Sequence, residues 1–123
     1  MTEGTPGSSA DLKYEPIEHV PAELLASYVA SGDAELIRKA LYSASSYGSD
    51  WKWAQDQCLH FIRSEHRDVR WAATQVLGEL AFLGHPIEID RVIPALNEAM
   101  KDPDVAGEAD MSLDLVKHAF GLE

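Results

Sequence analysis

Residues 58–80, CLHFIRSEHRDVRWAATQVLGEL, constrain the fold more than any other part of the chain. They read as the end of an apolar helix, a short polar turn, and a second, alanine-rich helix that opens at Asp68-Val69-Arg70. The two helices of this hairpin have matching apolar faces, which a single hairpin cannot bury alone. The segment therefore predicts stacked neighbouring hairpins, and such stacks usually provide surfaces for binding rather than pockets for chemistry.

Apolar residues recur at helical spacing in six segments, and no segment shows the sustained alternation of a β-strand. The first predicted helix opens at Pro21 and closes at Ser31-Gly32. Asp33 and Asp50 are expected to cap the next two helices, because a carboxylate there accepts free backbone N–H groups. The positions predicted to face inward are Leu36, Ile37, Ala40, Leu41, Ala44, Ala54, Cys58, Phe61, Ile62, Val69, Ala72, Ala73, Val76, Leu77, Leu80, Val92, Ile93, Leu96, Ala99, Met100, Val105, Ala109, Leu113, Val116 and Phe120.

The predicted helices also repeat along the chain. Asp68-Val69 aligns with Asp104-Val105 at a spacing of 36 residues, and the apolar residues that follow each pair align as well. Leu36 and Ala40 fall 33 residues before Val69 and Ala73. Chance alignment of amphipathic helices is the alternative, but the turn with its Asp-Val pair occurs twice. We therefore predict an all-α fold, an α-solenoid of about three helical hairpins.

The chain is acidic, with a formal net charge of −11. Residues 51–86 hold four acids and four bases, whereas residues 87–123 hold nine acids and three bases, a net of −6. Nucleic-acid binding needs clustered Lys and Arg, so the charge argues against it. It favours a basic protein partner that would bind mainly to the last third of the chain. A role of the negative charge in solubility alone is an equally ordinary explanation.

The N-terminal residues 1–16 contain Gly, Ser and Pro and are expected to form a flexible leader. One helical-repeat domain should then occupy residues 17–123. The leader lacks the pattern of a secretory signal, and no apolar run approaches the roughly 20 residues that cross a bilayer. A single cysteine excludes an internal disulfide framework. We therefore expect a cytoplasmic monomer that does not contact a membrane.

The central hairpin resembles the HEAT-repeat class of helical proteins. The residues that carry this resemblance are Asp68, Val69, Arg70, Ala72, Ala73, Leu77 and Gly78. Asp102-Pro103-Asp104-Val105 matches the same pattern more weakly. In that class an Asp and an Arg commonly link neighbouring units through a polar ladder. The next unit has Ala106 where Arg70 stands, so the resemblance implies a ladder that is broken or capped there.

A narrower resemblance covers about residues 35–120. Trp51-Lys52-Trp53-Ala54-Gln55, Cys58-Leu59, Val69-Arg70, Asp104-Val105-Ala106-Gly107 and Ala109-Asp110 resemble small bacterial HEAT-like proteins. Some of these are immunity proteins of contact-dependent inhibition and related polymorphic toxin systems. This resemblance implies a toxin domain as the partner.

Aromatic and amide side chains on the central hairpin are the first candidates for a binding site. With Val69 and Ala73 facing inward, Trp71, Thr74, Gln75, Gly78 and Glu79 should fall on the opposite side, which lines the concave surface of a stacked array. An exposed tryptophan beside polar groups is typical of a binding hot spot. Packing of Trp71 against a neighbouring hairpin is the alternative.

Two further groups extend the predicted partner-binding site. Trp53 and Gln57 share a helical face and could form a recognition edge, although a tryptophan at a helix start is more often a structural clamp.

Glu108, Asp110 and Asp114 form an acidic patch with the loop acids Asp102 and Asp104. Asp110 and Asp114 lie four apart, where like charges repel slightly. A partner that supplies cations would relieve this repulsion, and a solvated helical face is the alternative.

Motifs for catalysis are weak throughout the sequence. His66-Arg67-Asp68 matches a kinase tripeptide, but it lacks a glycine-rich loop and reads as a hairpin turn. His60, His66 and Cys58 have poor spacing for a metal, and Cys58 should lie in the core. We therefore predict no enzyme, no metal and no cofactor.

The function predicted from the sequence is that of a non-catalytic protein-binding module. Its specific form is an immunity protein that occludes a basic toxin domain, with a nuclease as the expected toxin. The alternative is a generic scaffold or assembly factor that docks a helix or loop of its partner. A helical enzyme or DNA-repair solenoid would need a basic concave face, against which the charge of −11 argues.

Overall fold

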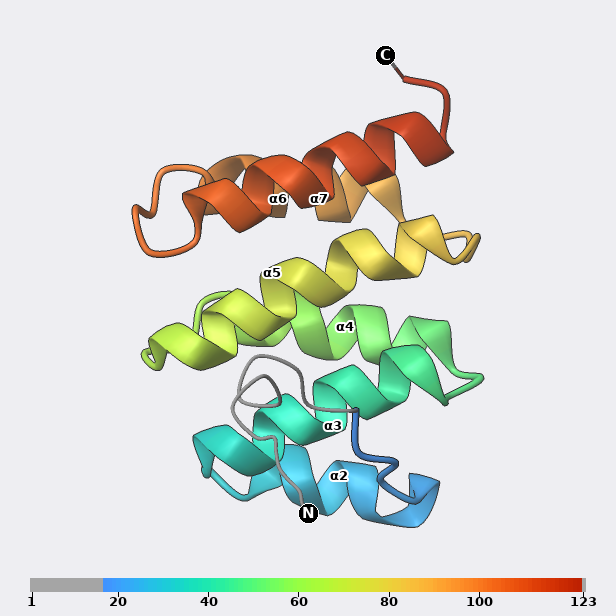
Figure 1. Cartoon of the computed structure of the whole chain (residues 1–123), viewed down its shortest axis with the longest axis vertical. Coiled ribbons are helices and arrows are strands. Elements are labelled where there is room, and N and C mark those ends of the chain that lie inside the picture. Colours follow the sequence, from blue (N-terminus) through green and yellow to red (C-terminus); the bar gives the residue numbers. More distant parts are fainter. Residues whose placement is uncertain (1–16, 123) are drawn as a thin grey trace, which may run out of the picture.

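The computed structural model describes residues 17–122, and over this range the chain folds into helices without any strand. The helices are α2 (Ala22–Ala30), α3 (Ala34–Ser46), α4 (Trp51–Phe61), α5 (Arg67–Phe82), α6 (Ile89–Ala99) and α7 (Ala106–Ala119) (Figure 1). The prediction of an all-α fold is confirmed. The predicted leader, residues 1–16, lies outside the described residues. Within those residues, no helix has the length and apolar character needed to cross a bilayer.

The predicted caps explain where two of the helices begin. Oδ1 of Asp33 accepts hydrogen bonds from the backbone N–H groups of Glu35 and Leu36 at 2.9 and 3.1 Å. Oδ1 of Asp50 accepts from the N–H of Trp53 at 3.0 Å. These bonds satisfy donors that the first turn of a helix leaves free. Both aspartates therefore act as the sequence predicts.

Three hairpins, α2–α3, α4–α5 and α6–α7, stack along the long axis of the molecule (Figure 1). The second helices of the hairpins, α3, α5 and α7, lie side by side in one layer, and the first helices lie behind them. Helix α5 packs against α3, α4 and α7, whereas the backbones of α4 and α6 lie farther apart and are joined by the ion pair between Arg91 and Asp56 at 3.0 Å. The inner layer is therefore the tighter one, as in a solenoid that curves around its second helices.

The core runs continuously through the three hairpins, with α5 at its centre. Leu41, Val69, Leu77, Leu96 and Val116 are fully buried. Most of the inward positions predicted from spacing are buried, while Leu36, Phe61, Ile93 and Phe120 are only partly so. Met100 is 38% exposed, contrary to the prediction. Its helix ends at Ala99, so Met100 no longer follows the buried stripe.

Thr74 and Gly78 also lie elsewhere than predicted, since both are buried. Oγ of Ser112 in α7 donates a hydrogen bond to the backbone carbonyl of Thr74 at 2.8 Å, and Gly78 packs against the same serine. They were expected on an open concave surface because helical spacing distinguishes only the inward face of the hairpin from the face opposite to it. In the stack, α7 covers this third side of α5.

Arg70 forms the polar ladder that the HEAT resemblance implies. Its Nε donates to Oδ2 of Asp102 and its Nη2 to Oδ2 of Asp104, each at 2.9 Å. Its Nη1 also donates to the carbonyl oxygens of Ser64 and Glu65. The arginine thus joins the turn of its own hairpin to the turn of the next. The ladder stops there, because Ala106 offers no further cation.

Candidate protein-binding face

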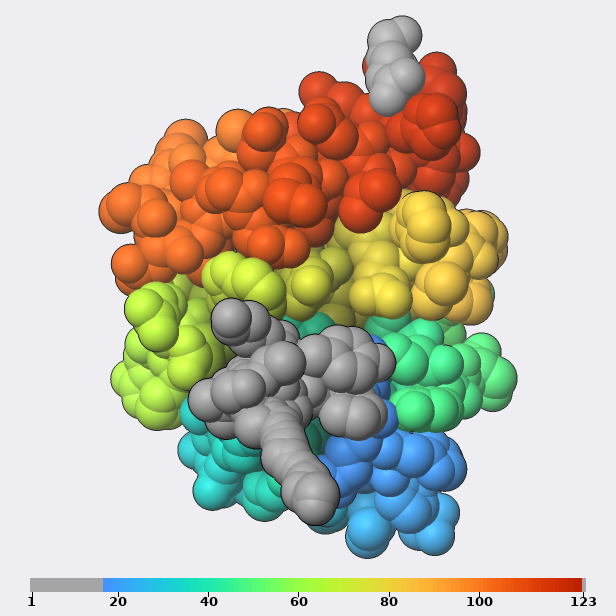
Figure 2. Space-filling view, in the orientation of Figure 1, coloured from blue at the N-terminus to red at the C-terminus, as the bar shows by residue number. Residues whose placement is uncertain are grey.

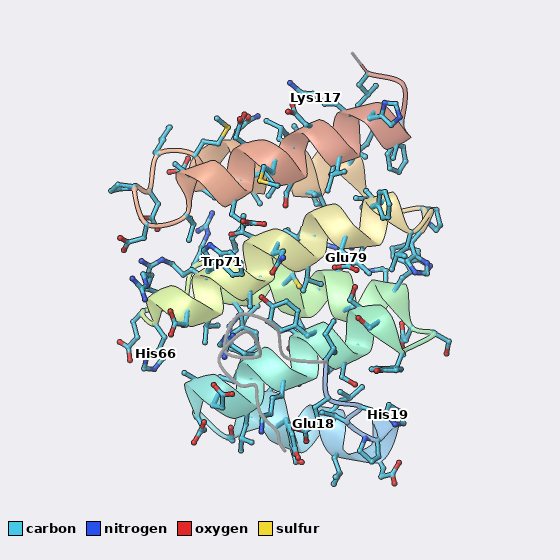
Figure 3. All side chains as sticks on the ribbon, in the orientation of Figure 1. Glu18, His19, His66, Trp71, Glu79 and Lys117 are labelled. Atoms are coloured by element: carbon cyan, nitrogen blue, oxygen red, sulfur yellow. The ribbon has the colours of Figure 1, made fainter. Side chains whose placement is uncertain are left out.

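Helix α5 is covered on three sides, so beyond its first turn it leaves only a narrow strip open to solvent in the inner layer. The strip comprises Trp71, Gln75, Glu79 and Phe82, at intervals of three or four residues. Trp71 is 37% exposed and Phe82 is 70% exposed. Figure 3 shows Trp71 and Glu79 on the side of α5 that faces the viewer. Packing therefore leaves three of the predicted binding residues, Trp71, Gln75 and Glu79, on one open strip.

Tyr42 of α3 connects to this strip. Its hydroxyl donates a hydrogen bond to Oε1 of Gln75 at 2.6 Å. The guanidinium carbon of Arg38, one helical turn earlier, lies 5.9 Å from the centre of the Tyr42 ring, within reach of a cation–π interaction. Arg38 also pairs with Glu35 at 2.8 Å. These contacts fix the orientation of the tyrosine and the amide, so this part of the surface is preorganised.

The electrostatic environment of Tyr42 shows which acids share its face. The pKa of Tyr42 is raised to about 12, and burial is the largest cause. Arg38 opposes this rise, and the nearby carboxylates of Glu108 and Glu79 contribute to it. Glu79 belongs to α5 and Glu108 to α7. Acids from two helices therefore lie near one tyrosine of a third.

Glu108 is separated from the other acids of α7. It is partly buried, and burial raises the pKa of its carboxyl. Asp110 lies two residues on, about 160° around the helix when measured the short way, and Asp114 lies one turn beyond Asp110. Ser112 packs on α5, whereas Asp110 and Asp114 are exposed. The predicted acidic patch thus divides into one acid on the inner layer and two on the outer side of α7.

Trp53 and Gln57 lie on α4, in the other layer of the stack. Both side chains are partly buried, and Trp53 packs against the hydrophobic core. The backbone of Trp53 is also held by Asp50. The structure therefore keeps this pair apart from Trp71, Gln75 and Glu79.

Six side chains define what we call the α5 face: Arg38, Tyr42, Trp71, Gln75, Glu79 and Glu108. Figure 2 views the molecule from this side, where the middle of α5 lies set back beneath the edge of α7. Arg38 and Tyr42 are not among the binding residues predicted from the sequence. Arg38 and Tyr42 are four residues apart, so they share one face of α3, and the buried Leu41 next to Tyr42 indicates that this face borders the core. This pattern could have predicted that both residues lie next to the strip.

The structure also locates the residues considered for catalysis. Cys58 is fully buried, and burial raises the pKa of its thiol, so it lies in the core as predicted. His66-Arg67-Asp68 forms the turn and the start of α5, also as predicted. Over residues 17–122, no three His, Cys, Asp or Glu side chains gather as metal ligands would.

No protein-family model and no curated protein matches the sequence. A solved structure does resemble it: a chain of the "CDI complex from Cupriavidus taiwanensis LMG 19424" superimposes with a TM-score of 0.78. The two chains share 25% sequence identity, and the match covers 85% of this chain and 95% of the other. The resemblance to proteins of contact-dependent inhibition, which the sequence predicts, is confirmed.

Proposed function

We propose that this chain is an immunity protein of a contact-dependent inhibition system, which binds a toxin domain and blocks its active surface. The observation that carries the proposal is the similarity to a chain of a CDI complex over nearly the whole length of both chains. A small helical stack without motifs for catalysis also suits a binding protein. The proposed protein works in the cytoplasm as a monomer and without a cofactor.

We assign toxin binding to the α5 face. Trp71 is large, half-exposed and set among polar groups, which are the features of an interface anchor. The bond between Tyr42 and Gln75 holds their side chains in place before binding, which reduces the conformational entropy lost in a complex. The face thus offers one anchor beside a preorganised polar pair.

The charge of the α5 face favours a basic toxin. Burial already raises the pKa of Glu108, and a cation from the partner would stabilise its ionised form. The net charge of −11 would also speed the encounter with a basic domain. A nuclease fits this description, because it must hold cations on its surface to bind phosphates. Blocking those cations would inhibit it without any chemistry.

The function is tested with the product of the gene immediately upstream, whose toxic domain is expressed alone or together with this chain. We expect co-expression to restore growth, and the purified pair to bind with a Kd in the nanomolar range by calorimetry. Failure to restore growth together with absence of binding would contradict the function. A tight complex with a harmless upstream product would favour the scaffold alternative instead.

The binding face is tested separately with charge-matched variants. Glu79→Gln with Glu108→Gln removes two charges from the α5 face, and Asp110→Asn with Asp114→Asn removes two from the outer side of α7. We expect the first pair to weaken binding about tenfold or more and the second to have little effect. Trp71→Ala should weaken it about 30-fold, and Trp53→Ala with Gln57→Ala much less. The reverse order would refute the assignment of the face but leave the function intact.

A further inference from the structure

A second concave feature lies away from the α5 face, between the second and third hairpins. It is an open cavity of about 340 Å³, with a floor formed by Ile62, Ala95 and Ala99. Ile62 and Ala99 are each only 8% exposed, and Ala95 is half-buried. The floor is therefore an apolar surface where the turn that follows α4 meets the last turns of α6.

Cations line the rim of this groove because two helices end beside it. Helix α4 ends at Phe61 and α6 at Ala99, and Arg63 and Lys101 follow these ends by two residues. The negative end of a helix dipole stabilises a nearby cation. This accounts for the two basic residues, but not for the apolar floor between them.

Most of the charges around the groove neutralise one another. Arg70 is bound by Asp102 and by two backbone carbonyls, and it is only 18% exposed. Nζ of Lys101 lies 3.5 Å from Oε1 of Glu98, with both side chains well exposed. These groups form the wall of the groove. They leave little net charge of their own.

Arg63 is the exception. Its side chain is exposed, and within residues 17–122 that side chain forms no hydrogen bond or ion pair. In the part of the chain that the structure describes, each other arginine or lysine except Lys117 lies within 4 Å of a carboxylate: Arg38, Lys39, Lys52, Arg67, Arg70, Arg91 and Lys101. The chain has 21 acids and only 10 bases, yet Arg63, at the edge of the groove, has no carboxylate partner among the described residues.

We propose that this groove docks an acidic segment of a partner protein and binds one Asp or Glu side chain of it. The Arg63 guanidinium would hold the carboxylate through two parallel hydrogen bonds. Ile62 and Ala99 would pack on the methylene groups or on an apolar neighbour. The groove is open to solvent, so it would cover too little of a small molecule to bind one tightly. The groove would bind an acidic segment, whereas the α5 face is proposed to bind a basic toxin. The proposal for the groove does not depend on the proposed function of the α5 face.

The test uses the full chain, labelled with ¹⁵N, and the peptide N-acetyl-Leu-Glu-Glu-Leu-amide as the probe. Titration should shift the backbone amide signals of Arg63, Ala95 and Ala99. The same peptide with Gln in place of both Glu residues should bind at least about tenfold more weakly, since the charged hydrogen bonds are lost. Succinate serves as a small dicarboxylate without a peptide chain, and it should bind much more weakly than the acidic peptide.

Two variants and one control identify the site. Arg63→Gln should weaken peptide binding about tenfold, and Ala95→Leu should weaken it by filling the floor. Lys117→Gln removes the other unpaired cation of residues 17–122 and should leave binding unchanged. Equal losses in R63Q and K117Q would reduce the effect to general charge attraction and overturn the proposal. Succinate binding as tightly as the peptide, or no shifts around the groove, would overturn it as well.

Discussion

Gly78 of α5 lies directly against Ser112 of α7, so closely that any side chain at position 78 would collide with the neighbouring helix. A Cβ atom built on Gly78 would lie 2.5 Å from Oγ and 2.8 Å from Cα of Ser112. Because a backbone atom is involved, a rotamer change cannot relieve the contact. The second and third hairpins therefore depend on this glycine for their spacing.

Gly78→Ala should destabilise the protein by about 1–3 kcal/mol, the usual cost of overpacking a core. Alanine is the better helix former by roughly 1 kcal/mol, so the collision must outweigh that gain. Urea unfolding measures the difference. Gly107→Ala is the matched control in α7, where a Cβ would meet nothing within 4 Å. We expect that variant to be as stable as the parent or slightly more so, and equal effects at both positions would disprove the close contact.

Arg70→Ala should cost about 2 kcal/mol of unfolding free energy. The variant loses hydrogen bonds to charged groups and leaves Asp102, whose side chain is 30% exposed, without its partner. Arg67→Ala is the control, because Arg67 pairs only with the exposed, adjacent Asp68 and should matter by less than about 0.5 kcal/mol. A double-mutant cycle with Asp102→Ala measures the coupling. Additive effects of the two substitutions would mean that no ladder joins the hairpins.

Tyr42→Phe should remove one tyrosine ionisation near pH 12 from the ultraviolet absorbance titration. The pKa of Tyr42 is raised to about 12 in the folded protein, against an ordinary value of 10.0. The folded state therefore holds this proton more tightly, so the contribution to stability is complete below about pH 10 and is lost as the pH rises toward 12. The variant should lose less stability over this range. If the absorbance change near pH 12 were the same in Tyr42→Phe as in the parent, that ionisation would belong to another residue.

Below about pH 5 the outer layer should lose stability through Asp56 and Glu88. Burial opposes the ionised form of Asp56, but hydrogen bonds from Lys52, Gln55 and Arg91 outweigh it and lower the pKa. Hydrogen bonds from Arg91 and Gln55 lower the pKa of Glu88. Carboxyls with lowered pKa values stabilise the fold above their ordinary values of 3.8 and 4.5, and this stability is lost as the pH falls through the lowered values.

Glu88→Gln tests the acid-sensitive network, since a neutral amide cannot take part in this titration. The urea midpoint of the parent should fall more steeply between pH 5 and pH 3 than that of the variant. Glu65→Gln is a suitable control, because the Glu65 side chain is 89% exposed. Parallel pH profiles for the parent and E88Q would argue against the prediction.

Spacing and capping rules were enough to predict the helices and most of the core. Asp33 and Asp50 cap their helices through contacts within a few residues, so local sequence determines them. The errors concern contacts between hairpins. Thr74 and Gly78 were assigned to an open surface because periodicity shows that a helix has a polar side, but not which neighbour covers it.

The candidate site was predicted only in part for the same reason. Trp71, Gln75 and Glu79 share one strip because they follow a single helix. Tyr42 was missed because its bond to Gln75 joins residues 33 positions apart. Likewise, Glu108 and Asp110 are neighbours in the sequence but lie on different sides of α7. Grouping acids by sequence position cannot separate those on the α5 face from those on the outer side of α7.

The burial of Cys58 gives this protein a built-in reporter of its own opening. It is the sole cysteine of the chain, it has no exposed surface, and it lies where α4 meets α5. A maleimide or disulfide reagent can modify it only in molecules whose central hairpin has come apart. The labelling rate therefore measures how often the middle of the stack opens. It would slow whenever a bound partner holds the hairpins together.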